Sequence, residues 1–215
     1  MIRKKASVLY APGFNCEEET MEIIRLAGGN PRLVFIDYIL SGRQKITDCD
    51  LFSIPGGFSY GDHIDPGAIV ALRLKEKFQE LIEAGIVIGG NCNGNQVLVQ
   101  LGIFGEKIAM DENDSGRFCS HPYIQHRVQP SNCVWTNGME GEIITYPQAH
   151  RFGKYVGDLS GVQTVMTYEG FSPNGGKVAA ICSDNGRIFA TMGHPERNLG
   201  NSLCVKLYEN ALKAA

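Results

Sequence analysis

The stretch Gly-Gly-Asn-Cys-Asn-Gly-Asn-Gln, residues 89–96, decides the fold of this chain. A short apolar run before it predicts a buried strand, and an apolar run after it predicts the start of a helix. Cys92 therefore lies at a strand-to-helix turn, between Gly90 and Gly94. This G-x-C-x-G pattern is a cysteine version of the nucleophile elbow, in which glycines allow a strained turn to close. Taken alone, the pattern fits a buried cysteine at an ordinary tight turn equally well.

Composition limits the class of protein. The chain has 215 residues and a formal net charge of −3, which fits one α/β domain spanning residues 1–215. No stripe of Lys and Arg indicates nucleic-acid binding, and no apolar run is long enough for a membrane span or a signal peptide. The seven cysteines are scattered singly, as is typical of reduced thiols in the cytoplasm.

The order of apolar segments predicts a doubly wound, mostly parallel α/β sheet. Asn15 is a candidate N-cap of the first helix, and Asp65 with Pro66 is a candidate start of a later one. Between residues 108 and 168 the apolar runs are short, which predicts antiparallel strands added to the main sheet. The remaining segments are predicted strands at residues 8–11, 33–36, 51–54, 178–182 and 188–192, the last two forming a hairpin, and a final amphipathic helix at residues 199–214.

Four residues in the antiparallel region raise the possibility of a metal site. They are Cys119, His121, His126 and Cys133. Their spacing matches no common zinc pattern, and alternate positions on strands explain such residues equally well. We therefore predict no metal in this chain.

Two further segments place chemistry at the ends of predicted strands. Residues 55–62, Pro-Gly-Gly-Phe-Ser-Tyr-Gly-Asp, follow the third strand, and Gly56-Gly57 lets backbone amides approach a ligand closely. His194-Pro195-Glu196 follows the last strand. In an extended chain, the side chains of His194 and Glu196 would project to one face, so that the carboxylate orients the imidazole. A cysteine, a base and an orienting acid at one edge of a sheet predict nucleophilic catalysis.

These segments together resemble the class I glutamine amidotransferases, a flavodoxin-like family. More closely, the chain resembles the glutaminase subunits of phosphoribosylformylglycinamidine synthase, over nearly its whole length. The motifs that the resemblance rests on are Gly90-x-Cys92-x-Gly94-x-Gln96, Pro12-Gly13-x-Asn15-Cys16, the eight residues 55–62, Asn113-x-Ser115-Gly116-x-Phe118 and His194-Pro195-Glu196-Arg197.

The resemblance implies a role for each motif residue. Cys92 would attack the side-chain amide of glutamine and form a γ-glutamyl thioester. His194 would pass the proton to the leaving ammonia, and Glu196 would orient His194. The residues implied in binding the oxyanion or the substrate are Gly57, Phe58, Asn93 and Gln96.

The resemblance also implies partners. The ammonia would pass to a separate ATP-dependent synthetase subunit, which makes formylglycinamidine ribonucleotide in purine biosynthesis, and a small third subunit often accompanies the pair. ATP and Mg²⁺ would bind to the synthetase, so that this chain itself needs no cofactor. The absence of a Walker A or G-x-G-x-x-G motif fits that division. The isolated chain is then expected to be a poor glutaminase.

Three positions depart from the family pattern. Arg151 follows His150 where the family usually has glycine, so we expect backbone strain there if that position has positive φ. Asn91 and Asn95 flank the nucleophile with two amides that need partners. His150 is a candidate lining residue without a catalytic role. A class I glutaminase serving a different synthetase and a non-catalytic interaction module of the same fold remain alternatives.

Overall fold

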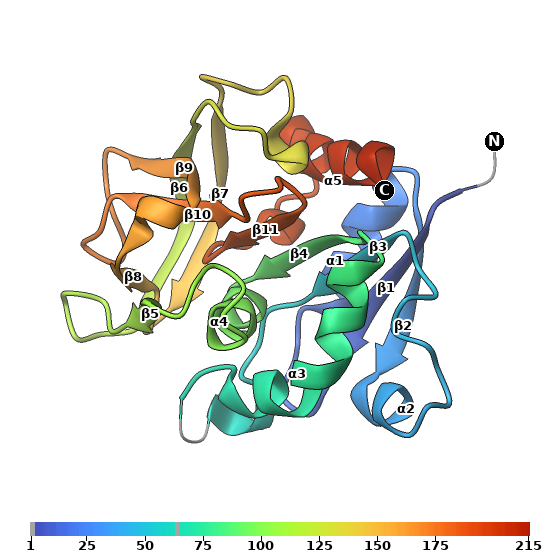
Figure 1. Cartoon of the computed structure of the whole chain (residues 1–215). Coiled ribbons are helices and arrows are strands. Elements are labelled where there is room, and N and C mark those ends of the chain that lie inside the picture. The colour runs from blue at the N-terminus through green and yellow to red at the C-terminus, as the bar shows by residue number, and fades with distance from the viewer. Residues whose placement is uncertain (1–2, 63–64) are drawn as a thin grey trace.

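One nine-stranded sheet organises the protein (Figure 1), and the computed structural model describes residues 3–62 and 65–215. The order of strands is β2-β1-β3-β4-β11-β10-β9-β6-β7, and a separate two-stranded sheet pairs β5 with β8. The strands are β1 (Lys5–Tyr10), β2 (Asn30–Phe35), β3 (Leu51–Ile54), β4 (Val87–Asn91), β5 (Ile108–Asp111), β6 (Cys119–Val128), β7 (Ile143–His150), β8 (Lys154–Gly157), β9 (Gln163–Glu169), β10 (Val178–Cys182) and β11 (Ile188–Thr191).

The sheet has a parallel half and an antiparallel half. Strands β2, β1, β3, β4 and β11 are parallel to one another. From β11 onward, β10, β9, β6 and β7 pair antiparallel, and Figure 1 shows them on the far side of the molecule from β1 and β2. The prediction of a mostly parallel α/β sheet with added antiparallel strands is confirmed. Because β1, β3, β4 and β11 are parallel, the segments that follow them meet at one edge of the sheet.

Helices cover both faces of the parallel half. They are α1 (Glu17–Leu26), α2 (Ile36–Leu40), α3 (Ala68–Glu83), α4 (Asn93–Gln100) and α5 (Ser202–Ala214). Ala6 and Val8 of β1 pack in one core with residues of α1 and α5, whereas Leu9 packs in a second core with residues of α3 and α4. This alternation is the period of two that a strand imposes on its side chains. No helix in the described part of the chain is long and apolar enough to span a membrane.

The start of α3 differs from the prediction. Asp65 and Pro66 do not begin the helix, because Gly67 has φ +79° and the helix starts at Ala68. A Cβ on Gly67 would lie 2.6 Å from the backbone N of Val97 in α4. The close approach of α3 to α4 therefore requires glycine, and its left-handed backbone separates Pro66 from the helix.

The starts of the other helices differ less from the predicted positions. Helix α1 begins at Glu17 with Cys16, not Asn15, at the N-cap position. Helix α5 begins at Ser202, and the side chain of Asn201 accepts a hydrogen bond from Leu203 N. The antiparallel region was predicted correctly in type, but β5 and β8 form their own small sheet and do not join the main one.

Candidate active site

Cys92 occupies a strained elbow between β4 and α4. Its backbone has φ 50° and ψ −109°, a region that residues with a Cβ rarely adopt. The N–H of Cys92 donates to Thr191 O of β11 over 2.8 Å, which fixes the elbow to the neighbouring strand. A Cβ on Gly90 would lie 2.7 Å from Gly94 O, and a Cβ on Gly94 would lie 2.0 Å from Ile54 O. Both glycines of the motif are therefore required by close backbone contacts.

His194 and Glu196 form a buried pair beyond the end of β11. His194 Nδ1 lies 2.7 Å from Glu196 Oε1, and both side chains are almost fully buried. Pro195 begins a 3₁₀ turn, η4 (Pro195–Arg197), so the two side chains meet across a turn and not along the extended chain that the sequence predicts. The other imidazole nitrogen, Nε2, is buried without a hydrogen-bond partner in the described chain.

The electrostatics of the pair favour a protonated imidazole. Burial lowers the pKa of His194, but the negative charges of Cys92 and Glu196 outweigh burial, so the net pKa is raised well above its ordinary value. A protonated imidazole beside Cys92 can give its proton to a leaving group at that sulfur.

Asn91 holds the second carboxylate oxygen of Glu196. Its Nδ2 donates to Glu196 Oε2 over 2.7 Å and to the Tyr208 hydroxyl over 2.8 Å. The amide expected to need partners therefore has them, and it orients the acid of the pair. Tyr208 lies in α5, and no pattern in the sequence indicates this contact beyond an aromatic residue on the apolar face of that helix. Asn95 is less well satisfied, because its buried Oδ1 has no partner in the described chain.

Within the part of the chain that the structure describes, two of the three predicted oxyanion donors have a backbone N–H that is free to bind a ligand, and the third does not. In the described chain, neither Gly57 N–H nor Asn93 N–H has a hydrogen-bond acceptor. Phe58 N–H, by contrast, donates to Gly13 O over 2.8 Å. The backbone amide of Phe58 is therefore already used, and Phe58 contributes its half-exposed ring instead.

Side chains of the elbow tie the surrounding loops together. Asn93 accepts from Ser59 N over 3.0 Å and donates to Asp62 Oδ1 over 3.0 Å. Gln96 Oε1 accepts from Asn93 Nδ2 over 2.9 Å, and Gln96 Nε2 donates to Phe152 O over 2.7 Å. Both polar ends of Gln96 thus bind the protein itself, and Gln96 does not line the cavity at Cys92. Its contact with substrate stays a prediction.

The loop after β7 carries two corrections. Arg151 has no positive φ, so the expected strain is absent. Its Nε donates to Glu112, and its guanidinium lies over the Phe152 ring at 5.7 Å. His150 is buried and bonds Gln148 and Asn113 over 2.8 and 3.2 Å, and it does not line the cavity. Ala149, next to this loop, does line the cavity at Cys92, and its carbonyl accepts a hydrogen bond from Cys92 Sγ over 3.6 Å.

A cavity of about 180 Å³ opens over Cys92. The rings of Phe58 and Phe118, 6.5 Å apart, form part of its wall, and both are about half exposed. The lining residues are Asn15, Gly57, Phe58, Cys92, Phe118, Ala149, His194 and Arg197. The cavity therefore combines the predicted nucleophile, base and one backbone donor with Asn15 of the loop after β1.

The metal hypothesis gains no support from the positions of its residues. No three of Cys119, His121, His126 and Cys133 lie close enough to share an ion. His126 is fully buried, stacked on the Tyr146 ring at 3.7 Å and bonded to Ile144 O. Within residues 3–62 and 65–215, the one compact group of possible ligands is Cys16, His194 and Glu196, whose last two members already bond each other.

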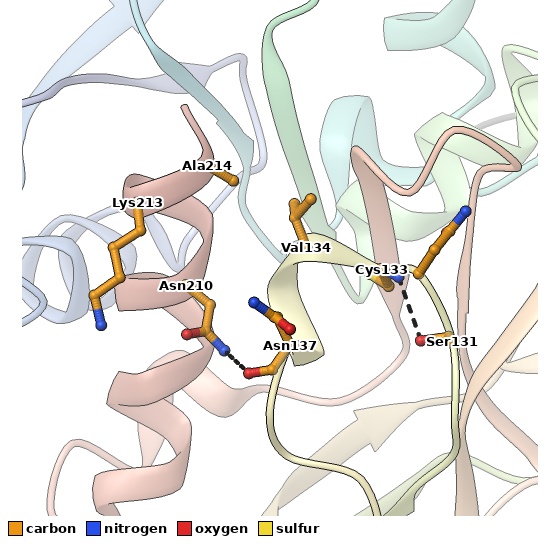
Figure 2. A pocket seen from close by; sticks show the side chains of 8 residues that line it. Ser131, Cys133, Val134, Asn137, Asn210, Lys213 and Ala214 are labelled. Carbon is orange, nitrogen blue, oxygen red and sulfur yellow. Dashed lines mark hydrogen bonds between the residues drawn. The ribbon is translucent and has the colours of Figure 1, made fainter.

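A larger hollow lies away from this site. Figure 2 shows a cavity of about 380 Å³ between α5 and the turn η2 (Val134–Thr136). Asn210 Nδ2 crosses it to Asn137 O over 2.9 Å, and Ser131, Cys133 and Lys213 also line it. None of the predicted catalytic, oxyanion or substrate-binding residues lines it. The chemistry thus places the candidate active site in the smaller cavity.

Comparison with known proteins agrees with this geometry. A family model for the CobB/CobQ-like glutamine amidotransferase domain matches residues 3–170 and 154–210. A solved glutamine amidotransferase from Thermotoga maritima, 15% identical with a TM-score of 0.60 over 91% of this chain and 77% of its own, shares the fold. The class of protein is therefore a glutamine amidotransferase domain.

Closer relatives define the family. A phosphoribosylformylglycinamidine synthase subunit PurQ from Dehalococcoides mccartyi is 35% identical, over 92% of this chain and 86% of its own. A chain of the PurLQS structure from Thermotoga maritima is 32% identical with a TM-score of 0.88, over 99% of each chain. The chain belongs to the family of PurQ subunits of phosphoribosylformylglycinamidine synthase, as the resemblance in its motifs predicted.

Proposed function

We propose that this chain hydrolyses glutamine to glutamate and ammonia at Cys92, as the glutaminase subunit of a phosphoribosylformylglycinamidine synthase. The observation that carries the proposal is the joint placement of a strained cysteine elbow and a buried His194–Glu196 pair on one cavity. Family membership supports the same activity, because the relatives are named as subunits of that synthase.

The reaction follows from the positions of the three residues. The Cys92 thiolate attacks the side-chain carbonyl carbon of glutamine, and the resulting oxyanion lies near the N–H groups of Gly57 and Asn93. The protonated His194 gives its proton to the leaving nitrogen, ammonia departs, and a thioester remains. Water, deprotonated by His194, then attacks the thioester, which releases glutamate and restores the thiolate. Glu196 holds the imidazole through Nδ1 in both steps.

We further propose that the ammonia is used by an ATP-dependent synthetase subunit and that a small third subunit completes the assembly. The Thermotoga maritima relative, which comes from a PurLQS structure, supports a partner of this kind. ATP and Mg²⁺ would act on the synthetase, and this chain would need no cofactor of its own. We place the protein in the cytoplasm, in keeping with seven cysteines that are all unpaired.

Glutamine hydrolysis with and without partners tests the proposal. The purified chain is assayed alone and with the two candidate partner subunits, formylglycinamide ribonucleotide and ATP. We expect slow hydrolysis alone and strong stimulation, coupled to amidine formation, in the complete mixture. Cys92→Ala should remove hydrolysis in both conditions while the chain still folds and binds its partners. Turnover retained by Cys92→Ala, or none in the complete wild-type mixture, would overturn the proposal.

A further inference from the structure

Arg197 is the charged side chain of the cavity that the reaction does not use. Of the eight lining residues, only Cys92, His194 and Arg197 can carry a charge, and the first two form the reacting pair. Arg197 lies three residues after His194, and its backbone N–H donates to His194 O over 3.1 Å. The backbone of Arg197 is thereby tied to the same turn that positions His194.

One contact fixes the guanidinium, and the rest of it stays open. Arg197 Nη2 donates to the sulfur of Cys16 over 2.9 Å. In the described chain, Arg197 has no carboxylate partner at ion-pair distance, and no other hydrogen bond of its guanidinium is found. An arginine beside a nucleophile, anchored at one corner and without an acid, presents a donor fork to a bound anion.

Cys16, the residue after Asn15 in the loop that follows β1, supplies the anchor. It is fully buried, and its Sγ lies 3.9 Å from His194 Nδ1 and 3.2 Å from Asn15 Oδ1. Space there is limited, since a Cβ on Gly56 would lie 3.1 Å from the same sulfur. Cys16 therefore acts as a fixed support that sets where the guanidinium of Arg197 rests.

A second donor lies beside the guanidinium. Asn15 lines the cavity, and its Oδ1 is taken up by Cys16. Its Nδ2 has no acceptor in the described chain. The loop after β1 and the turn after β11 thus present an amide and a guanidinium on the same cavity as Cys92.

We propose that Arg197, supported by Cys16 and joined by Asn15, binds the α-carboxylate of the substrate and so selects an amino acid over a simple amide. This inference rests on the proposed glutaminase function. Glutamine carries a carboxylate at the opposite end from the amide that Cys92 attacks, and a carboxylate leaving water needs a cationic or hydrogen-bonding partner. In this cavity, Arg197 is the cation not already engaged with Glu196.

The test compares two substrates in the assembled complex. 4-Aminobutanamide is glutamine without its α-carboxylate, so it keeps the reacting amide and loses only the group that Arg197 would bind. Wild-type kcat/KM should be far higher for glutamine. In Arg197→Gln, kcat/KM for glutamine should fall about 10- to 100-fold, mainly through KM, as expected for a lost charge-assisted pair. The value for 4-aminobutanamide should stay within about twofold.

Variants of Cys16 test the proposal independently. Cys16→Ala removes the acceptor of Arg197 Nη2 and should raise KM for glutamine, whereas Cys16→Ser keeps an acceptor and should restore part of the loss. Arg25→Gln in α1, where the arginine pairs with Glu22 at the surface, is the matched control and should leave kcat/KM unchanged for both substrates.

Two outcomes would overturn the inference. Arg197→Gln could leave glutamine kinetics unchanged, or it could lower kcat/KM for both substrates equally, which would mark a structural role. The rate of Cys92 alkylation in Arg197→Gln reports whether the elbow is intact. A wild-type complex that hydrolyses neither substrate would instead count against the glutaminase function itself.

Discussion

Asn91 Nδ2 lies 2.7 Å from Glu196 Oε2, so the residue before Cys92 directly holds the carboxylate that bonds His194. The other oxygen of Glu196 bonds His194 Nδ1. The carboxylate is thus fixed at both oxygens, and the His194 ring is fixed through it. Such support of a base by a second layer of hydrogen bonds is how a catalytic geometry is maintained.

Removing this support should weaken catalysis more than binding. Asn91→Ala leaves Glu196 Oε2 and the Tyr208 hydroxyl buried without a partner, which should cost about 1–3 kcal/mol of stability. We expect kcat for glutamine hydrolysis to fall at least about 10-fold with little change in KM, because His194 loses its fixed orientation. Steady-state kinetics and urea unfolding measure the two effects. Tyr208→Phe removes one partner of Asn91 but keeps the contact with Glu196, so it should retain most of kcat.

The backbone strain at Cys92 should lower the stability of the protein, and replacing Cys92 by glycine should relieve it. Its φ of 50° with ψ −109° costs on the order of 1–3 kcal/mol for a residue with a Cβ. Cys92→Gly should therefore be at least as stable as Cys92→Ala, although glycine normally lowers stability by about 0.5–1 kcal/mol. Both variants lack the sulfur and should be inactive. Thermal unfolding of the two, measured side by side, decides the matter, and an alanine variant clearly more stable than the glycine variant would contradict strain at the elbow.

The candidate catalytic residues could be brought together from the sequence because each belongs to a short motif at the end of a strand. Cys92 and His194 are identified by their immediate neighbours, and parallel strands bring such ends together without further information. The fold class followed from the same periodicities. That residues 1–215 form a single domain remains a prediction, supported by one sheet that collects strands from both ends of the chain.

Contacts between distant segments could not be predicted. The bonds of Asn91 to Glu196 and Tyr208 join residues 105 and 117 positions apart. Gly67 interrupts the expected start of α3 because of its contact with Val97, which no local pattern records. The position of Phe58 after Gly57 predicts an oxyanion donor, but its backbone amide bonds Gly13 O in the preceding loop. In each case, the contact depends on how separate segments pack together, and the local sequence does not specify that packing.

The glycine of the elbow should tolerate no side chain. A Cβ on Gly94 would lie 2.0 Å from Ile54 O, a backbone atom that cannot move without displacing β3. We expect Gly94→Ala to destabilise the protein by about 3 kcal/mol or more, as overpacking against backbone does. Gly200→Ala is the control, because a Cβ there meets nothing within 4 Å and the residue does not have positive φ. Equal unfolding midpoints in urea for the two variants would show that the elbow can relax.

Two buried histidines should make the protein sensitive to mild acid. Burial lowers the pKa of His126 to about 3 and that of His150 to about 4. In the unfolded chain both regain their ordinary pKa of 6.5, so between these values the unfolded state binds protons that the folded state does not. The free energy of unfolding should therefore fall as pH drops below about 6.5, by up to about 1.4 kcal/mol per pH unit for each histidine.

Replacing one of these histidines separates their contribution from that of the carboxylates. His126→Gln loses the stacking on Tyr146 and should be less stable at pH 7, but its stability should fall less steeply from pH 6.5 to pH 5 because one titrating group is gone. Urea unfolding across that range, with exposed His121→Gln as the control, gives the slopes. A slope identical to that of the wild type would mean that folding leaves the pKa of His126 unchanged, contrary to the lowering that its burial causes.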